Sequence, residues 1–150
     1  MNISKIKKHI THIVESNKSK SEKLQEICNH LKNETDFYDW VGFYFINGDK
    51  RELKLAQFSG DPTEHVIIPF GKGICGQAAE SNQNFIISDV SSQDNYISCG
   101  WKVKSEIVIP IFVNGKNIGQ IDIDSHTLNA FSKKDELLLE FVCEKVAHLF

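Results

Sequence analysis

The sequence predicts an α+β fold in which an antiparallel sheet carries helices on its faces. Apolar residues recur at helical spacing near both ends of the chain, while the middle contains short apolar runs separated by turn residues. Two of those turns contain Asn-Gly, at Asn47-Gly48 and Asn114-Gly115, which is a strong signal for a β-hairpin. Helices at the ends and hairpins between them indicate separate layers of helix and sheet.

Three amphipathic helices are expected, two near the N-terminus and one at the C-terminus. Ser19 and Glu22 have the spacing of a capping box that opens the second helix. Ser132 can cap the third helix, and Asp135 and Glu136 fall in its first turn, where acidic side chains are favourable. The three apolar stripes are Ile3, Ile6, Ile10, Ile13 and Val14, then Leu24, Ile27, Cys28 and Leu31, and finally Leu138, Val142, Val146 and Leu149.

The region between these helices is expected to hold the strands and one short helix. The short helix should cover Ile74 to Ser81 and begin at Gly71-Lys-Gly73. There are no internal repeats or linkers, so residues 1–150 are expected to form a single domain. The predicted strands are Trp40–Ile46, Leu53–Phe58, His65–Ile68, Phe85–Ser88, Glu106–Val113 and Asn117–Asp124.

The composition is that of an ordinary globular protein. The chain has 150 residues, of which 41% are hydrophobic and 25% charged, with a net charge of −3. This charge gives no basic field for nucleic acid. The start of the chain lacks the apolar stretch of a signal peptide, and no run approaches the roughly 18 apolar residues of a membrane span. We therefore expect a cytoplasmic protein that binds neither membranes nor nucleic acid.

The four cysteines are scattered and show no zinc-site spacing, and a reducing compartment disfavours a disulfide framework. Cys28 and Cys143 fall on apolar helix stripes and are expected in the core. Cys75 and Cys99 have glycine-flanked, loop-like settings and are expected to be more accessible. Cys75 stands at a helix start, which stabilises a thiolate, although a small packing residue explains the position equally well. Cys99 is either an incidental surface thiol or a functional one.

Three carboxylates lie in apolar strands. Asp122 and Asp124 are two residues apart and therefore share a face, and Glu106 should pair with residues 123–124 across the hairpin. One interpretation is a solvated outer face. The other is a site for a cationic guest, either a metal or an ammonium group, in which at least one carboxyl has a raised pKa and can act as a general acid.

The first predicted strand offers walls for such a site. Val41, Phe43 and Phe45 share one face and are the better core candidates. Trp40 and Tyr44 lie on the other face, and each combines an apolar ring with a polar group, so they are candidate pocket walls.

Taken together, these motifs resemble the GAF-domain family, and within it the free methionine-(R)-sulfoxide reductases. The resemblance spans about residues 36 to 145. The matching stretches are Trp40-Val-Gly-Phe-Tyr44, Ile68-Pro-Phe-Gly-Lys-Gly-Ile-Cys75-Gly76, Asp89-Val90, Ser105-Glu106-Ile-Val-Ile-Pro110 and Ile121-Asp-Ile-Asp-Ser125.

The resemblance implies a six-stranded antiparallel sheet between helices, a small closed pocket, and a homodimer formed through the terminal helices. It also implies that Cys99 attacks the sulfoxide and that an upstream cysteine, here Cys75, resolves the product. The acids matching Glu106, Asp122 and Asp124 would bind the substrate's amino group and assist proton transfer, and Trp40 and Tyr44 would line the methyl end. The chain departs from the family at His65, where a further cysteine is usual, and in the loop around Cys99.

Three functions follow as hypotheses. The first is a cofactor-free reductase of free methionine-(R)-sulfoxide, in which Cys99 forms a sulfenic acid, Cys75 condenses with it, and a thioredoxin-like reductant reopens the disulfide. Glu106, Asp122 or Asp124 would protonate the departing oxygen. The second is a GAF sensory module that binds a small molecule without turnover. The third is an acidic site for a hard cation such as magnesium or calcium.

Overall fold

The computed structural model describes residues 1–93 and 102–150, and its architecture confirms the predicted α+β fold. The strands form one six-stranded sheet in the order β3-β2-β1-β6-β5-β4, with antiparallel neighbours throughout. A short 3-10 helix at Val90–Ser92 was not predicted. In chain order the elements are α1 (Ile3–Glu15), α2 (Lys20–Glu34), β1 (Trp40–Ile46), β2 (Glu52–Ser59), β3 (Ile67–Pro69), α3 (Gly73–Ser81), β4 (Phe85–Ile87), β5 (Ser105–Val113), β6 (Lys116–Ser125) and α4 (Lys133–Ala147).

Helices α2 and α4 begin where capping side chains satisfy backbone donors that the helix itself leaves unpaired. The Ser19 hydroxyl accepts a hydrogen bond from the backbone N–H of Glu22 at the start of α2. At the start of α4, Ser132 and Asp135 form a reciprocal capping box, in which the backbone N–H of Ser132 donates to Asp135 Oδ2 at 2.8 Å. Both predicted helix starts are therefore confirmed. Within the described chain, no helix is both long and apolar enough to cross a membrane.

The β5–β6 hairpin forms as its Asn-Gly turn predicts. Asn114 has φ of 52° and Gly115 has φ of 77°, and two consecutive positive φ values are typical of the type I′ turn. The strand predicted at His65–Ile68 instead covers Ile67–Pro69. His65 lies outside it because its backbone is bonded elsewhere: its carbonyl accepts from the Tyr44 hydroxyl and its N–H donates to Thr63 Oγ1.

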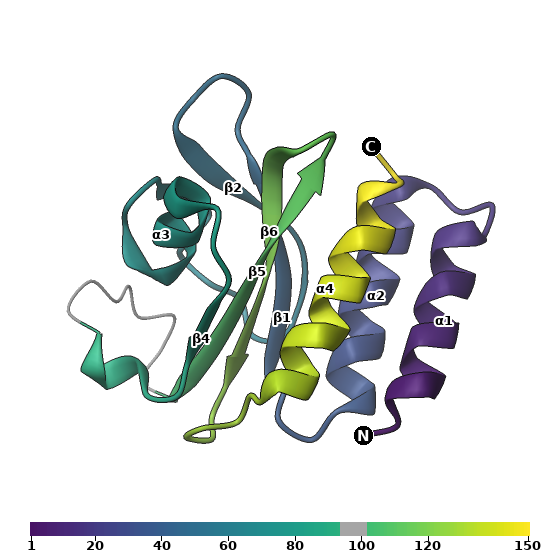
Figure 1. Cartoon of the computed structure of the whole chain (residues 1–150), viewed down its shortest axis with the longest axis horizontal. Coiled ribbons are helices and arrows are strands. Elements are labelled where there is room, and N and C mark those ends of the chain that lie inside the picture. The colour runs from purple at the N-terminus through teal and green to yellow at the C-terminus, as the bar shows by residue number, and fades with distance from the viewer. Residues whose placement is uncertain (94–101) are drawn as a thin grey trace.

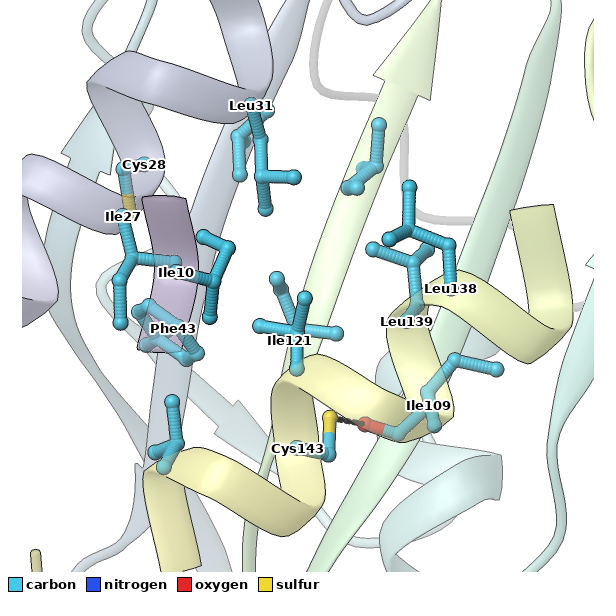
Figure 2. Close-up of a cluster of buried hydrophobic side chains, with 14 of the residues drawn as sticks. Ile10, Ile27, Cys28, Leu31, Phe43, Ile109, Ile121, Leu138, Leu139 and Cys143 are labelled. Atoms are coloured by element: carbon cyan, nitrogen blue, oxygen red, sulfur yellow. Dashed lines mark hydrogen bonds between the residues drawn. The ribbon is translucent and has the colours of Figure 1, made fainter. Parts of the chain in front are cut away.

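The larger hydrophobic core lies between one face of the sheet and three helices. In Figure 1, α2 and α4 lie between the sheet and α1, which forms the outermost layer on that side. Figure 2 shows Ile10, Ile27, Leu31, Phe43, Ile121 and Leu139 converging from these helices and strands. Val41 and Phe43 belong to this core and Phe45 packs against it, as the strand alternation predicts.

Cys28 and Cys143 lie in this core, which confirms their predicted structural role. The Cys143 thiol donates to the carbonyl of Ile109 at 3.5 Å (Figure 2). Burial raises the pKa of both thiols far above the ordinary value, since the charged thiolate is disfavoured away from water. Both cysteines are therefore inert packing residues.

The opposite face of the sheet is covered by α3, which Figure 1 shows on the other side from α1, α2 and α4. A second, smaller hydrophobic cluster fills this space and includes Trp40, Tyr44, Ile74 and Cys75. Asp122 and Asp124 point to this side because Ile121 and Ile123 belong to the larger core. Asp122 and Asp124 therefore lie on the face of the sheet that α3 covers.

Candidate active site

The three carboxylates come together on the neighbouring strands β5 and β6. Glu106 pairs with Asp124, and Asp122 pairs with Val108, two residues along. Their residue exposures are 3% for Glu106 and 1% for both Asp122 and Asp124, so the interpretation as a solvated sheet face is wrong. It fails because α3 and the second cluster cover this side of the sheet, which strand alternation alone cannot reveal.

Cys75 joins these acids from the first turn of α3. Its Sγ lies 3.8 Å from Glu106 Oε2, and one ligand atom each from Cys75, Glu106 and Asp122 lie within 4.8 Å of one another. The expectation that Cys75 is accessible is wrong, since only 6% of the residue is exposed. Cys75 is buried because its side chain packs in the second hydrophobic cluster, between α3 and the sheet.

Burial controls the electrostatics of the acid cluster. The pKa of Asp122 is raised, mainly because desolvation disfavours the carboxylate, while hydrogen bonds with Glu106 and Cys75 act in the opposite direction. The prediction that at least one of the acids has a raised pKa is confirmed. The cluster therefore holds a carboxyl that can keep its proton at a higher pH than an ordinary aspartate does.

A small cavity of about 10 Å³ adjoins this cluster. That volume is close to the space one water molecule needs, which is about 10–15 Å³. Lys72 is exposed and His65 partly exposed at its wall, and neither was predicted from the sequence to belong to the site. The Gly-Lys-Gly turn before α3 was the one available signal for Lys72. The lining residues are His65, Ile68, Lys72, Gly73, Ile74, Cys75, Glu106 and Asp122.

Trp40 and Tyr44 lie on the same side of the sheet as the acids, although neither lines this cavity in the part of the chain that the structure describes. The Trp40 indole stacks on Phe58 with ring centroids 5.6 Å apart, and its Nε1 donates to the carbonyl of Asp61. The Tyr44 hydroxyl donates to the carbonyl of His65 at 2.8 Å. Tyr44 thus fixes the segment that carries His65 in the cavity wall.

Gln120 and Asp124 are two further buried polar residues on the same face of β6 as Asp122, outside the set that lines the cavity. Gln120 is fully buried, and neither polar atom of its side-chain amide has a hydrogen-bond partner among the described residues. Asp124 pairs with Trp40 on one side and with Glu106 on the other, so it lies between the aromatic cluster and the acid cluster. The Cys99 prediction lies outside the described residues, as does its pairing with Cys75.

Comparison with known proteins assigns the family. A model of the GAF domain matches residues 17–150. The chain is 39% identical over 116 residues to GAF domain-containing protein A of Dictyostelium discoideum, covering 77% of this chain and 72% of that protein. It is 41% identical over 98 residues to free methionine-R-sulfoxide reductase of Escherichia coli, covering 65% of this chain and 58% of that protein.

Solved structures agree with this assignment. The type II free methionine-R-sulfoxide reductase from Thermoplasma acidophilum is 40% identical with a TM-score of 0.83, covering 87% of this chain and 91% of that one. The free methionine-R-sulfoxide reductase from Neisseria meningitidis, solved in complex with its substrate, is 32% identical with a TM-score of 0.93, covering 99% of this chain and 87% of that one. This chain therefore belongs to the GAF-domain family, in the group that contains the free methionine-R-sulfoxide reductases.

Proposed function

We propose that this protein is a thiol-dependent enzyme that reduces free methionine-R-sulfoxide to methionine. The observation that carries the proposal is the convergence of Cys75, Glu106 and Asp122 in a covered cavity, within a fold shared with reductases of that substrate. A buried group of acids beside a thiol supplies both a cation-binding surface and a proton donor, which this reaction needs.

The acids serve substrate recognition in this proposal. Ionised carboxylates among Glu106, Asp122 and Asp124 hold the substrate's ammonium group, because a buried negative charge is stabilised by an opposite charge. A methionine within a polypeptide lacks that free ammonium, so the enzyme selects the free amino acid. Trp40 and Tyr44 contact the methyl end of the substrate, where apolar rings provide a matching surface.

The chemistry runs through Cys99 and Cys75. The Cys99 thiolate attacks the sulfoxide sulfur, the sulfur–oxygen bond breaks, and methionine leaves while Cys99 keeps the oxygen as a sulfenic acid. A protonated carboxyl, with Glu106 and the raised-pKa Asp122 as the candidates, supplies the proton to that oxygen. The Cys75 thiol then displaces water and forms a disulfide, which a thioredoxin-like dithiol reduces by exchange.

Substrate binding requires the cavity to widen. Its volume of about 10 Å³ accommodates one water molecule, whereas sites for small organic ligands measure roughly 300–1,000 Å³. Lys72 and His65 are the more exposed parts of the cavity wall, so we infer that displacement in this region contributes to substrate entry.

We also propose that the protein forms a homodimer, as the family resemblance implies. Size-exclusion chromatography with light scattering tests this oligomeric state.

A coupled assay tests the enzymatic proposal. The reduced protein is given a thioredoxin system with either diastereomer of free methionine sulfoxide, and consumption of NADPH is followed. We expect turnover of the R diastereomer, loss of turnover in Cys99→Ser, and full turnover in the core control Cys28→Ala. Binding of the sulfoxide without turnover of either diastereomer would instead identify a sensory module.

A further inference from the structure

The donor set beside the cavity contains a soft ligand together with two hard ones. Cys75 Sγ comes from α3, Glu106 from β5 and Asp122 from β6, and one ligand atom of each lies within 4.8 Å of the other two. The metal site expected from the sequence was one of three carboxylates for magnesium or calcium. The structure instead groups a thiol with two acids, and a thiolate favours zinc-like cations over these hard ones.

A second observation, at Asp122, also points to a ligand at this donor set. Asp122 lines the cavity, is 1% exposed, and its Oδ1 has no hydrogen-bond partner among the described residues. Leaving a buried acceptor unpaired is unfavourable, because the group has lost its hydrogen bonds to water and gained none in return. An electron-pair acceptor in the cavity would remove that cost.

The cavity volume and the distance between Cys75 Sγ and Glu106 Oε2 fit a single metal ion. The cavity of about 10 Å³ is too small for an amino acid without rearrangement. In a tetrahedral zinc site, bonds of about 2.3 Å to sulfur and about 2.0 Å to oxygen place these two ligands about 3.5 Å apart. Cys75 Sγ and Glu106 Oε2 are 3.8 Å apart, so a shift of a few tenths of an ångström brings them to ligating geometry.

We propose that Cys75, Glu106 and Asp122 form a binding site for one thiophilic divalent cation, with Zn²⁺ as the expected ion. The thiolate and the two carboxylate oxygens are three ligands, and water completes the fourth position, as in zinc sites with three protein ligands. Binding releases the thiol proton and any proton held by the acids, so affinity rises with pH.

The bound cation would block the reductase, because it occupies the carboxylates of Glu106 and Asp122 that would bind the substrate. It also sequesters the Cys75 thiol that resolves the sulfenic acid. This consequence rests on the proposed function, whereas binding itself does not. Direct observation of the cation therefore separates failure of this inference from failure of the enzymatic proposal.

Cobalt(II) is a suitable spectroscopic probe for the site. The reduced, metal-free full-length protein is titrated with Co²⁺ while the thiolate-to-cobalt charge-transfer band and the visible bands of four-coordinate cobalt are recorded. We expect saturation at one equivalent per chain and loss of both sets of bands when Zn²⁺ is added. Absence of a charge-transfer band at saturating Co²⁺ would overturn the proposal.

Variants assign the ligands. Cys75→Ser should abolish the charge-transfer band, and the isosteric Asp122→Asn should weaken Co²⁺ binding at least tenfold, while the surface control Asp49→Asn leaves it unchanged. Cys99→Ser should keep the band; loss of the band in Cys99→Ser with retention in Cys75→Ser would contradict the assignment. Should Cys75→Ser fail to fold, mass mapping of alkylated wild-type protein replaces it. Zn²⁺ must then slow alkylation of Cys75 at least tenfold, and an unchanged rate would refute the site.

Discussion

The Trp40 indole lies flat against the sheet because position 42 has no side chain. A Cβ at Gly42 would lie 2.3 Å from Cη2 of Trp40, a distance that real Cβ atoms essentially never show. Gly42 also pairs with Asp122 on β6, so the indole lies beside the strand position of the buried acid. Gly42 thus allows the Trp40 ring to lie beside the strand position of the buried acid Asp122.

Gly42→Ala should destabilise the protein by roughly 1–3 kcal/mol, because the new methyl group overpacks a covered face. Urea denaturation followed by circular dichroism measures the change in the free energy of unfolding. Displacement of the indole should also change its fluorescence in the folded state. An alanine variant with wild-type stability and wild-type fluorescence would contradict the described packing.

At Asp122, the raised pKa makes a prediction about pH. The folded state holds the proton to a higher pH than the unfolded state, whose carboxyl has a pKa near 4. The contribution of Asp122 to stability is therefore fully present below about pH 4 and is lost as pH rises through the folded-state pKa. Asp122→Asn, which cannot ionise, should become more stable relative to wild type over this interval. Urea titrations at several pH values measure that difference, and a pH-independent difference would contradict the burial of a titrating carboxyl.

At the scale of elements, a stacked pair of histidines joins α1 to α2. The rings of His9 and His30 have centroids 4.0 Å apart, and Nε2 of His30 is buried without a hydrogen-bond partner among the described residues. Burial lowers the pKa of His30, the charges of His9 and Lys5 lower it further, and Glu34 opposes them. Protonation of His30 therefore weakens the contact between the two helices.

The unfolded state then binds more protons than the folded state as pH falls below the ordinary histidine pKa of about 6.5. Stability should decline with acidification from that point down through the lower folded-state pKa. His30→Gln should reduce this decline, while His126→Gln, an exposed position directly after β6, should not. Thermal unfolding between pH 5 and pH 7.5, roughly the histidine range, tests this. Equal acid sensitivity of wild type and His30→Gln would show that the pair has no such effect.

The position of α3 depends on Gly76. Because the obstacle to a Cβ there is the backbone carbonyl of Pro69 at 2.5 Å, the helix itself must shift in Gly76→Ala. Such a shift changes the position of Cys75 relative to Glu106, and a misplacement of about 1 Å can cost roughly 100-fold in rate. We expect turnover to fall at least tenfold, while Glu80→Ala, an exposed change on the same helix, retains it. Wild-type turnover of Gly76→Ala would mean that the placement of α3 does not matter for catalysis.

These elements also show which features of the structure could be predicted from the sequence. Helix starts at Ser19 and Ser132 and the turn at Asn114-Gly115 were predictable because each depends on local chemistry. The grouping of Glu106 with Asp124 followed from hairpin register. The burial of the acids and of Cys75 did not follow, since alternation assigns a residue to a face but does not show which element covers that face.

At the scale of the whole molecule, the sheet order explains why the site is assembled from distant segments. The central strand β6 lies between β1 and β5, so the acids of the C-terminal hairpin lie beside Trp40 from the first strand. The larger core on the opposite face contains Cys28 and Cys143, far from this chemistry. Motif resemblance recovered this long-range arrangement, whereas local patterns did not.

The larger core holds the two thiols that the proposed cycle does not use, Cys28 and Cys143. Cys28 and Cys143 have strongly raised pKa values and remain protonated, whereas the proposed cycle oxidises Cys75 and Cys99 together. A single-turnover experiment therefore tests the proposed thiol cycle. Fully reduced protein is mixed with excess free methionine-R-sulfoxide without a reductant, alkylated, and mapped by mass spectrometry. We expect the loss of two thiols per chain and a disulfide that joins the peptides of Cys75 and Cys99. Cys28 and Cys143 should remain reduced and become alkylated after denaturation. Formation of methionine with the Cys75 thiol still reduced, or four intact thiols after treatment, would contradict the proposed cycle.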